Sequence, residues 1–226
     1  GHSGDRFNDL ADRLAVEAAS TQRPRSGAGI PDAVGPADED PARGRGDGAA
    51  PVPSGPPVPP GHLLAVLGHR PPELGGYDDN PVARDTRRRL GEIIGSKAEM
   101  VDDLAVLTGL GLGAEQLAAE AALDLGVPYV AVEPFPDPDS AWPQASRDHY
   151  RTLVDGAREV VRLERKVPDG RAKVAGSMRR RDAWLARAAS EAVLVWNRTD
   201  ERLAKLAGTL EDHLGDDVWI LEPTGE

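Results

Sequence analysis

The sequence lacks cysteine altogether. This absence excludes disulfide bonds, thiolate nucleophiles and Cys-ligated zinc sites, and it is typical of a cytoplasmic protein. No apolar run approaches the ~20 residues that a helix needs to cross a bilayer, so no membrane association is expected. The few histidines include no pair at the spacing of metal ligands on a helix, so the sequence predicts no metal site.

The chain also has no excess of positive charge, and its formal net charge is -11. A chain this acidic is a poor non-specific ligand for nucleic acid, since the neutralisation of phosphates supplies most of that affinity. One stretch departs from the rest of the chain. Residues 158–187 hold ten basic and four acidic side chains, and this island of charge could attract a small anion.

The composition divides the chain into three parts. Residues 22–61 hold 10 of the 20 prolines and 8 glycines, and such a segment cannot build a packed core. It is therefore a linker. Residues 1–21 contain the apolar spacing of one amphipathic helix. This segment is either a tail that forms helix only transiently, or it is a dimerisation arm or the remnant of an upstream fused domain. Residues 62–226 are long enough for one domain.

Within residues 62–226, short apolar runs alternate with amphipathic stretches. This alternation predicts an α/β fold, a Rossmann-like, doubly wound and mostly parallel sheet of about six strands. The expected strands are 63–67, 104–107, 128–132, 159–163, 192–196 and 218–221. The expected helices are 81–94, 114–125, 146–157, 177–190 and 200–214. In such folds ligands bind at the carboxyl ends of the strands, so the loops that follow strands are the candidates for function.

Two of these loops contain glycine together with polar residues. Gly68, His69 and Arg70 follow the first strand, where glycine allows a close approach and arginine suits a phosphate or carboxylate. Thr108–Gly113 follows the second strand and opens a helix, and its three alternating glycines could turn backbone N–H groups towards a phosphate. The motif is neither a P-loop nor the dinucleotide fingerprint. Glu115 and Gln116, in the first turn of that helix, could reach a ribose or base.

Arg179–Arg181 is expected at the start of a helix, where three positive charges oppose the helix dipole and a bound anion would offset that cost. In the loop after the fifth strand, Asn197 or Thr199 is expected either to cap the next helix or to contact a ligand. Trp142 and Trp196 could stack on a base, whereas Trp184 is expected in the core.

Six short motifs, taken together and in order, resemble the YpsA-like family of the SLOG superfamily. That Rossmann-like group also contains the DNA-processing protein DprA (Smf) and the LOG cytokinin-activating hydrolases. The motifs are Gly68-His69-Arg70, Thr108–Gly113, Glu133-Pro134-Phe135, Ser140-Ala141-Trp142-Pro143, Met178–Trp184 and Val193–Trp196. The resemblance covers nearly all of residues 63–223.

The resemblance implies a pocket for a nucleotide-like ligand, such as ADP-ribose or an NAD derivative, and no obligatory cofactor. The positions that match the family are Gly68, Arg70, Thr108, Gly109, Gly111, Gly113, Arg181 and Asp182. The ligand contacts that the sequence predicts are all of these except Asp182, together with His69, Gln116, Pro134, Trp142 and Asn197. Relatives commonly have Asn where this chain has Asp182, and a glycine-rich phosphate loop where it has Asn197–Arg202. The second difference argues against the LOG reaction.

Three functions are compatible with these residues. The first is the binding or sensing of a nucleotide-derived molecule. The second is an N-glycosidic hydrolase or transferase, in which Glu115 or Asp182 would be the catalytic carboxylate. The third is a DprA-like protein that associates with single-stranded DNA, for which the overall charge is unfavourable. A homodimer is expected by analogy with the superfamily.

Overall fold

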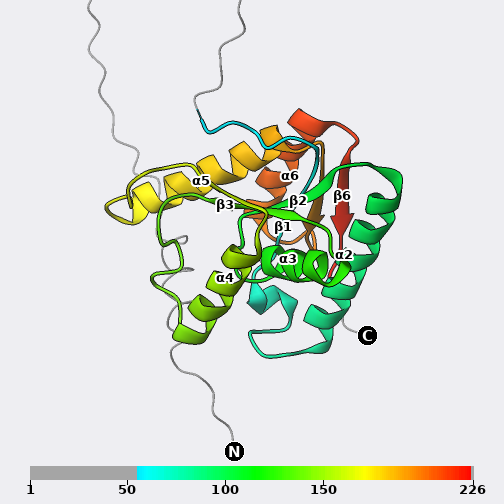
Figure 1. Cartoon of the computed structure of the whole chain (residues 1–226). Coiled ribbons are helices and arrows are strands. Elements are labelled where there is room, and N and C mark those ends of the chain that lie inside the picture. Colours follow the sequence, from blue (N-terminus) through cyan, green and yellow to red (C-terminus); the bar gives the residue numbers. More distant parts are fainter. Residues whose placement is uncertain (1–54, 225–226) are drawn as a thin grey trace, which may run out of the picture. The chain divides into compact units, whose positions relative to one another are not determined.

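The computed structural model describes residues 55–224 (Figure 1). The expectations for residues 1–21, and for most of the linker, lie outside the described residues. Between residues 55 and 224, no helix is long and apolar enough to pass through a bilayer.

A single sheet of six parallel strands forms the centre of the fold. The strands are β1 (His62–Gly68), β2 (Leu104–Thr108), β3 (Tyr129–Glu133), β4 (Glu159–Arg162), β5 (Glu191–Val195) and β6 (Val218–Leu221). Their order is β4-β3-β2-β1-β5-β6, and every neighbouring pair is parallel. The chain therefore builds outward from β1 to β4 and then crosses back to place β5 on the other side of β1. The predicted Rossmann-like fold class is confirmed.

Helices cover both faces of the sheet (Figure 1). They are α2 (Pro81–Met100), α3 (Ala114–Leu125), α4 (Gln144–Gly156), α5 (Arg171–Ala188) and α6 (Glu201–Leu214), and a short 3-10 helix, η1, spans Pro71–Leu74. Side chains of α2, α3 and α4 share one apolar cluster with alternate strand residues, and those of α5 and α6 share the other. Trp184 belongs to the α5 side of this core, as predicted. The central strands are apolar on both faces because both are buried.

Local sequence explains most helix ends. The side chain of Asn80 accepts a hydrogen bond from the backbone N–H of Ala83, and Pro81 occupies the first turn, where its missing N–H costs nothing. Gly126 ends α3 in the left-handed conformation that glycine adopts without strain. These three residues were predicted in these roles from the sequence. The cap of α6 is Asp200, however, and not Asn197 or Thr199.

Two helices differ from their predicted bounds by six residues at one end. α2 continues to Met100, six residues beyond the expected end. α5 begins at Arg171 instead of Ser177. The sequence pattern missed its first turns because they are largely exposed and carry no apolar periodicity. The placement of Arg179–Arg181 at a helix start was therefore wrong. These arginines lie within α5, and the cations at its first turn are Arg171 and Lys173.

The amino-terminal edge of the sheet holds one buried carboxylate, Glu191. It pairs with Lys97 at 2.7 Å and with the ring of His62. Burial alone would raise the pKa of Glu191, but hydrogen bonds from Lys97 and His62 outweigh burial and lower it. Partners within the chain satisfy this carboxylate, and its ion pairs link β5 to β1 and α2.

Candidate functional site

His69 joins three elements at the carboxyl edge of the sheet. Its backbone N–H donates to the carbonyl of Val195 at 3.0 Å, and its carbonyl accepts the N–H of Ala114, the first residue of α3, at 3.0 Å. Its ring accepts a third hydrogen bond, from the backbone N–H of Asn197, at 3.0 Å. The ends of β1 and β5 and the beginning of α3 are thus tied together by one residue, which lies at the point where the strand order reverses.

The glycine turn, Thr108–Gly113, is held in shape from inside. The Thr108 hydroxyl accepts from Leu110 N–H at 3.3 Å and donates to the carbonyl of Glu115 at 3.1 Å. Leu110 is buried in a left-handed conformation, with φ of 54°, which is uncommon for leucine. Gly113 has φ of 98°, and a Cβ there would lie 2.4 Å from the carbonyl oxygen of His69. Only glycine allows that approach.

The space over the glycine turn is occupied by an ion-paired group, the Arg181 cluster, which consists of Glu115, Arg181 and Asp182. The carboxylate of Glu115 accepts the N–H of Gly111 at 3.0 Å and pairs with the Arg181 guanidinium at 3.0 Å. Asp182 pairs with the same guanidinium at 2.7 Å. A Cβ at Gly109 would lie 2.5 Å from Nη1 of Arg181, so the guanidinium touches the turn itself.

The Arg181 cluster contains more carboxylates than cations. The Arg181 side chain is 6% exposed. Its burial would lower the pKa of the guanidinium, but the neighbouring charges of Glu115 and Asp182 outweigh that effect and raise it. Two carboxylates therefore share one buried cation. A ligand phosphate at this position would meet a guanidinium that is already neutralised.

A second buried group stands at the ends of β3 and β4. The Tyr150 hydroxyl donates to Glu133 at 2.9 Å, and Arg162 donates to the other oxygen of that carboxylate at 2.8 Å. Burial, followed by the charge of Glu133, raises the pKa of Tyr150. Trp142 packs edge-on against Tyr150, with ring centroids 5.4 Å apart. Sequence reasoning missed Tyr150 and Arg162, because nothing in their local patterns distinguishes them from ordinary helix and strand residues.

Most predicted ligand contacts come together at this edge. Gly68, His69 and Asn197 lie at the ends of β1 and β5, and the contacts from Thr108 to Gln116 lie at the end of β2, beside Arg181. Gln116 is turned inward and donates to the carbonyl of Leu110 at 3.2 Å. Arg70 is exposed, and Pro134 is buried after β3. Their roles as ligand contacts stay predictions.

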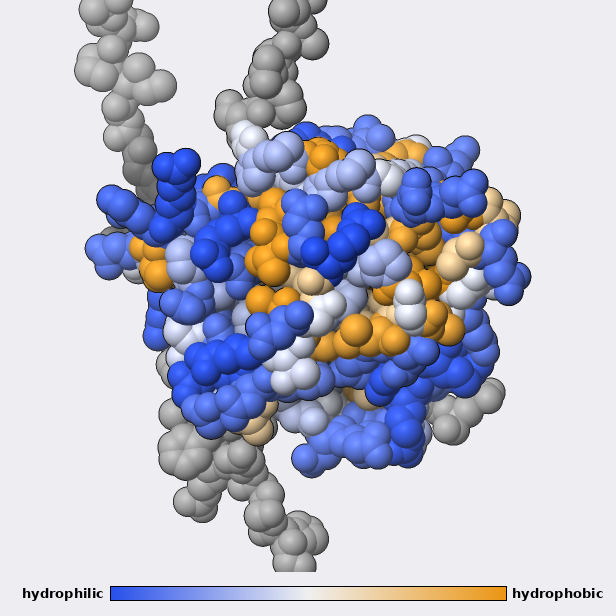
Figure 2. Space-filling model, in the orientation of Figure 1, coloured by the Kyte–Doolittle hydropathy of each residue, from blue (hydrophilic) through white to orange (hydrophobic). Residues whose placement is uncertain are grey.

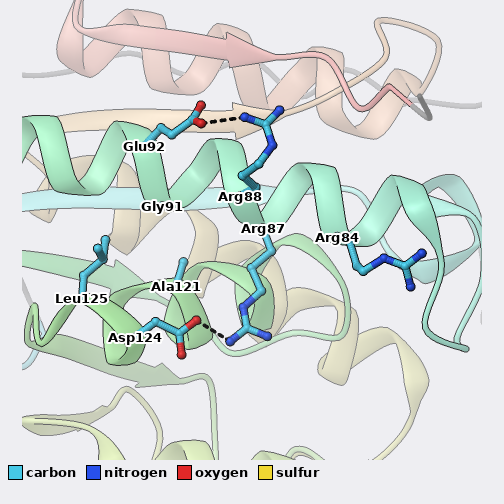
Figure 3. Close-up of a pocket in the computed structure, with 8 residues that line it drawn as sticks. All are labelled: Arg84, Arg87, Arg88, Gly91, Glu92, Ala121, Asp124 and Leu125. Carbon is cyan, nitrogen blue, oxygen red and sulfur yellow. Dashed lines mark hydrogen bonds and ion pairs between the residues drawn. The ribbon is translucent and has the colours of Figure 1, made fainter.

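A surface hollow of about 580 Å³ lies elsewhere, over α2 and α3 (Figure 3). Its charged residues pair with one another or with neighbours: Arg87 with Asp124 at 2.6 Å, and Arg88 with Glu92 at 2.6 Å. It contains none of the predicted ligand contacts. Among residues 55–224, no group of three or more histidine or acidic side chains is placed to hold a metal ion.

No protein-family model and no curated protein matches the chain. Solved structures that are similar include DNA processing protein A (DprA) from Streptococcus pneumoniae, with 18% identity, a TM-score of 0.48, and coverage of 70% of this chain and 50% of that one. DprA from Helicobacter pylori, described with a single-stranded DNA binding mode, has 13% identity, a TM-score of 0.47, and coverage of 70% and 64%.

The molybdenum cofactor carrier protein of Chlamydomonas reinhardtii is also similar, with 13% identity, a TM-score of 0.37, and coverage of 74% of this chain and 93% of that one. The chain spans only about half of the S. pneumoniae protein. At these sequence identities and TM-scores, the similar structures do not indicate what this chain binds. Its fold is defined by the strand order given above.

Proposed function

We propose that residues 62–226 form a SLOG-type, YpsA-like domain that binds a small nucleotide-like molecule at the carboxyl edge of β1, β2 and β5. One observation carries the proposal. Ten polar or charged side chains are buried within residues 55–224. Five of them lie at or over the ends of β1 and β2, namely His69, Thr108, Glu115, Gln116 and Arg181, and two more, Glu133 and Asp139, lie at the end of β3 or just after it. Burying polar groups is costly, so their concentration beside a reversal of strand order favours a binding site.

The geometry favours binding over hydrolysis. An N-glycosidic hydrolase needs a carboxyl group that exchanges a proton with water or with the departing base. Both predicted catalytic carboxylates, Glu115 and Asp182, are hydrogen-bonded to Arg181. A catalytic role would require one of them to leave its partner, whereas a binding role uses the edge as it stands.

Isothermal titration calorimetry with AMP, NAD and ADP-ribose tests the proposal. We expect at least one of them to bind, and Gly111→Asp to weaken binding, because the new carboxylate would project beside Glu115 at the β2 end of the site. Gly208→Asp is the matched control, since nothing lies within 4 Å of a Cβ at that position on α6. Failure of all three compounds to bind would overturn the proposal, whereas unchanged binding by Gly111→Asp would exclude the end of β2 from the site.

A second candidate, association with single-stranded DNA, has a separate observation in its favour. Five exposed cations around the start of α5 form no ion pair within residues 55–224: Arg165, Lys166, Arg171, Lys173 and Arg179. This side of the molecule, at the left of Figures 1 and 2, is predominantly hydrophilic. Lys166 and Arg171 lie close together in the sequence around Gly170, which precedes the helix.

Fluorescence anisotropy with labelled oligothymidylate tests this second candidate. We expect the oligothymidylate to bind with an affinity that falls steeply as the salt concentration rises. The triple variant Arg165→Ala, Lys166→Ala and Arg171→Ala should lose this binding. Arg88→Ala is the control, because that cation is already paired with Asp85 and Glu92. No binding at low salt would remove the candidate.

A further inference from the structure

The ring of His69 carries a buried N–H that has no acceptor. The residue is 1% exposed, and its Nε2 accepts the backbone N–H of Asn197 at 3.0 Å. A nitrogen that accepts a hydrogen bond carries no proton, so the proton of the neutral ring must be on Nδ1. Within residues 55–224, Nδ1 has no hydrogen-bond partner.

Trp196 presents a second donor of the same kind. Its Nε1–H is buried and also has no acceptor within the described part of the chain. The parallel register pairs Gly68 of β1 with Val195 of β5, and His69 and Trp196 are the residues that directly follow. Two orphan donors thus stand at the ends of adjacent strands. A buried donor without a partner destabilises the fold, which indicates that an acceptor belongs here.

The glycine turn offers no comparable opening. The Gly111 amide already donates to the Glu115 carboxylate, and the Arg181 guanidinium already serves two carboxylates. An anion entering the turn would have to displace Glu115, whose carboxylate now occupies the position that a phosphate would take.

Positive charge borders the two orphan donors. Arg70 follows His69, is exposed, and forms no ion pair within residues 55–224. Arg198 lies over the Trp196 ring, 6.0 Å from its centroid, and also pairs with Glu222 at 2.8 Å. An acceptor that bears negative charge would gain from these guanidinium groups.

We propose that the anionic group of the ligand binds between β1 and β5, on Nδ1–H of His69 and Nε1–H of Trp196, and not in the glycine turn. This inference rests on the proposed function and adds the chemistry of one end of the ligand. The group is a carboxylate or phosphate that presents oxygen acceptors to two neutral donors, with Arg70 at its rim.

Nuclear magnetic resonance of the indole N–H groups tests this proposal. Trp196→Phe identifies the Trp196 signal among those of the four tryptophans. Adding AMP should shift that signal downfield, and inorganic phosphate or acetate should do the same more weakly. A shift with phosphate alone identifies a phosphate subsite, and one with acetate alone identifies a carboxylate subsite. A shift with both indicates a general anion subsite.

Affinity measurements complete the test. Trp196→Phe keeps an aromatic ring and removes the donor, and we expect it to weaken AMP binding about tenfold. His69→Gln keeps an acceptor for Asn197 and moves the side-chain N–H donor away from the position of Nδ1, with a similar expected loss. Trp219→Phe, which alters an exposed indole on β6, is the control. If His69→Gln fails to fold, Trp196→Phe and the indole spectrum decide alone.

The possible failures are distinguishable. If AMP binds the unaltered protein while the Trp196 signal stays in place and Trp196→Phe binds normally, the subsite is overturned and the proposed function survives. If AMP, NAD, ADP-ribose and the smaller anions all produce neither heat nor shifts, both are overturned. If AMP fails to bind but phosphate shifts the Trp196 signal, the anion subsite stands and the nucleotide is the wrong ligand.

Discussion

The carboxyl edge of the sheet has two halves that differ in how their polar groups are satisfied. In the paired half, at the ends of β2, β3 and β4, Glu115, Arg181, Glu133 and Tyr150 find partners within the chain. In the donor half, at the ends of β1 and β5, His69 and Trp196 each keep a buried N–H without an acceptor. The comparison teaches that buried charges can satisfy one another within the chain, whereas the unsatisfied donors at the ends of β1 and β5 are where we propose that the ligand binds.

The largest effect should come from Arg181→Met. It leaves the Glu115 carboxylate, whose side chain is 10% exposed, without its cation. Removing one partner of a buried ion pair costs about 3–5 kcal/mol, and we expect that loss in the free energy of unfolding measured with urea. If stability changes by less than a quarter of this, the paired half is not a structural cluster and the comparison fails.

The triple variant Arg181→Met, Glu115→Gln and Asp182→Asn separates lost charge pairing from lost packing. With the carboxylates replaced by amides, no charge of the Arg181 cluster is left unpaired, so most of the stability should return. A triple variant as unstable as Arg181→Met would show that the packing of arginine, and not its charge, holds this half together.

Gly113→Ala should have the next largest effect, because Gly113 connects the two halves. Its φ of 98° and the 2.4 Å approach of a Cβ to the carbonyl of His69 make any side chain strained. We expect a loss of about 1–3 kcal/mol in urea unfolding. Gly208→Ala, in the interior of α6 with open space around it, should instead gain about 0.5–1 kcal/mol. Equal signs for the two variants would contradict the structure.

Alkaline pH should act on the paired half through Tyr150. Burial and the charge of Glu133 raise its pKa, so the folded state holds the phenolic proton more tightly than the unfolded state. The stability from this difference is fully present below the ordinary tyrosine pKa of about 10 and is lost as the pH rises above it. Tyr150→Phe should therefore lose less stability between neutral and alkaline pH than the unaltered protein, as measured by urea unfolding. Parallel pH profiles would refute this.

The smallest effect should be that of Trp196→Phe on stability. The variant removes a donor that has no partner, so no hydrogen bond is lost. We expect the free energy of unfolding to stay within about 1 kcal/mol of its original value. A loss as large as that of Arg181→Met would mean that the indole N–H is held in the folded protein after all, and the contrast between the two halves would disappear.

The sequence predicted the sheet well because buried parallel strands are continuous apolar runs that differ from their surroundings. It placed the start of α5 wrongly, because Arg171 to Gly176 are largely exposed and show no apolar periodicity. The meeting of the loops followed from the rule that parallel strands end at one edge. The pairing of Glu115 with Arg181 did not, since these residues are separated by 66 positions and only the folded sheet brings them together.

The left-handed Leu110 has a consequence for kinetics. Its backbone is held by hydrogen bonds to Thr108 and Gln116, so the chain itself fixes this loop of the candidate site. A molecule arriving at this edge has no loop to order and incurs little entropy loss from the protein. Association should then show a single phase whose rate rises linearly with concentration, without the plateau of a gated pocket.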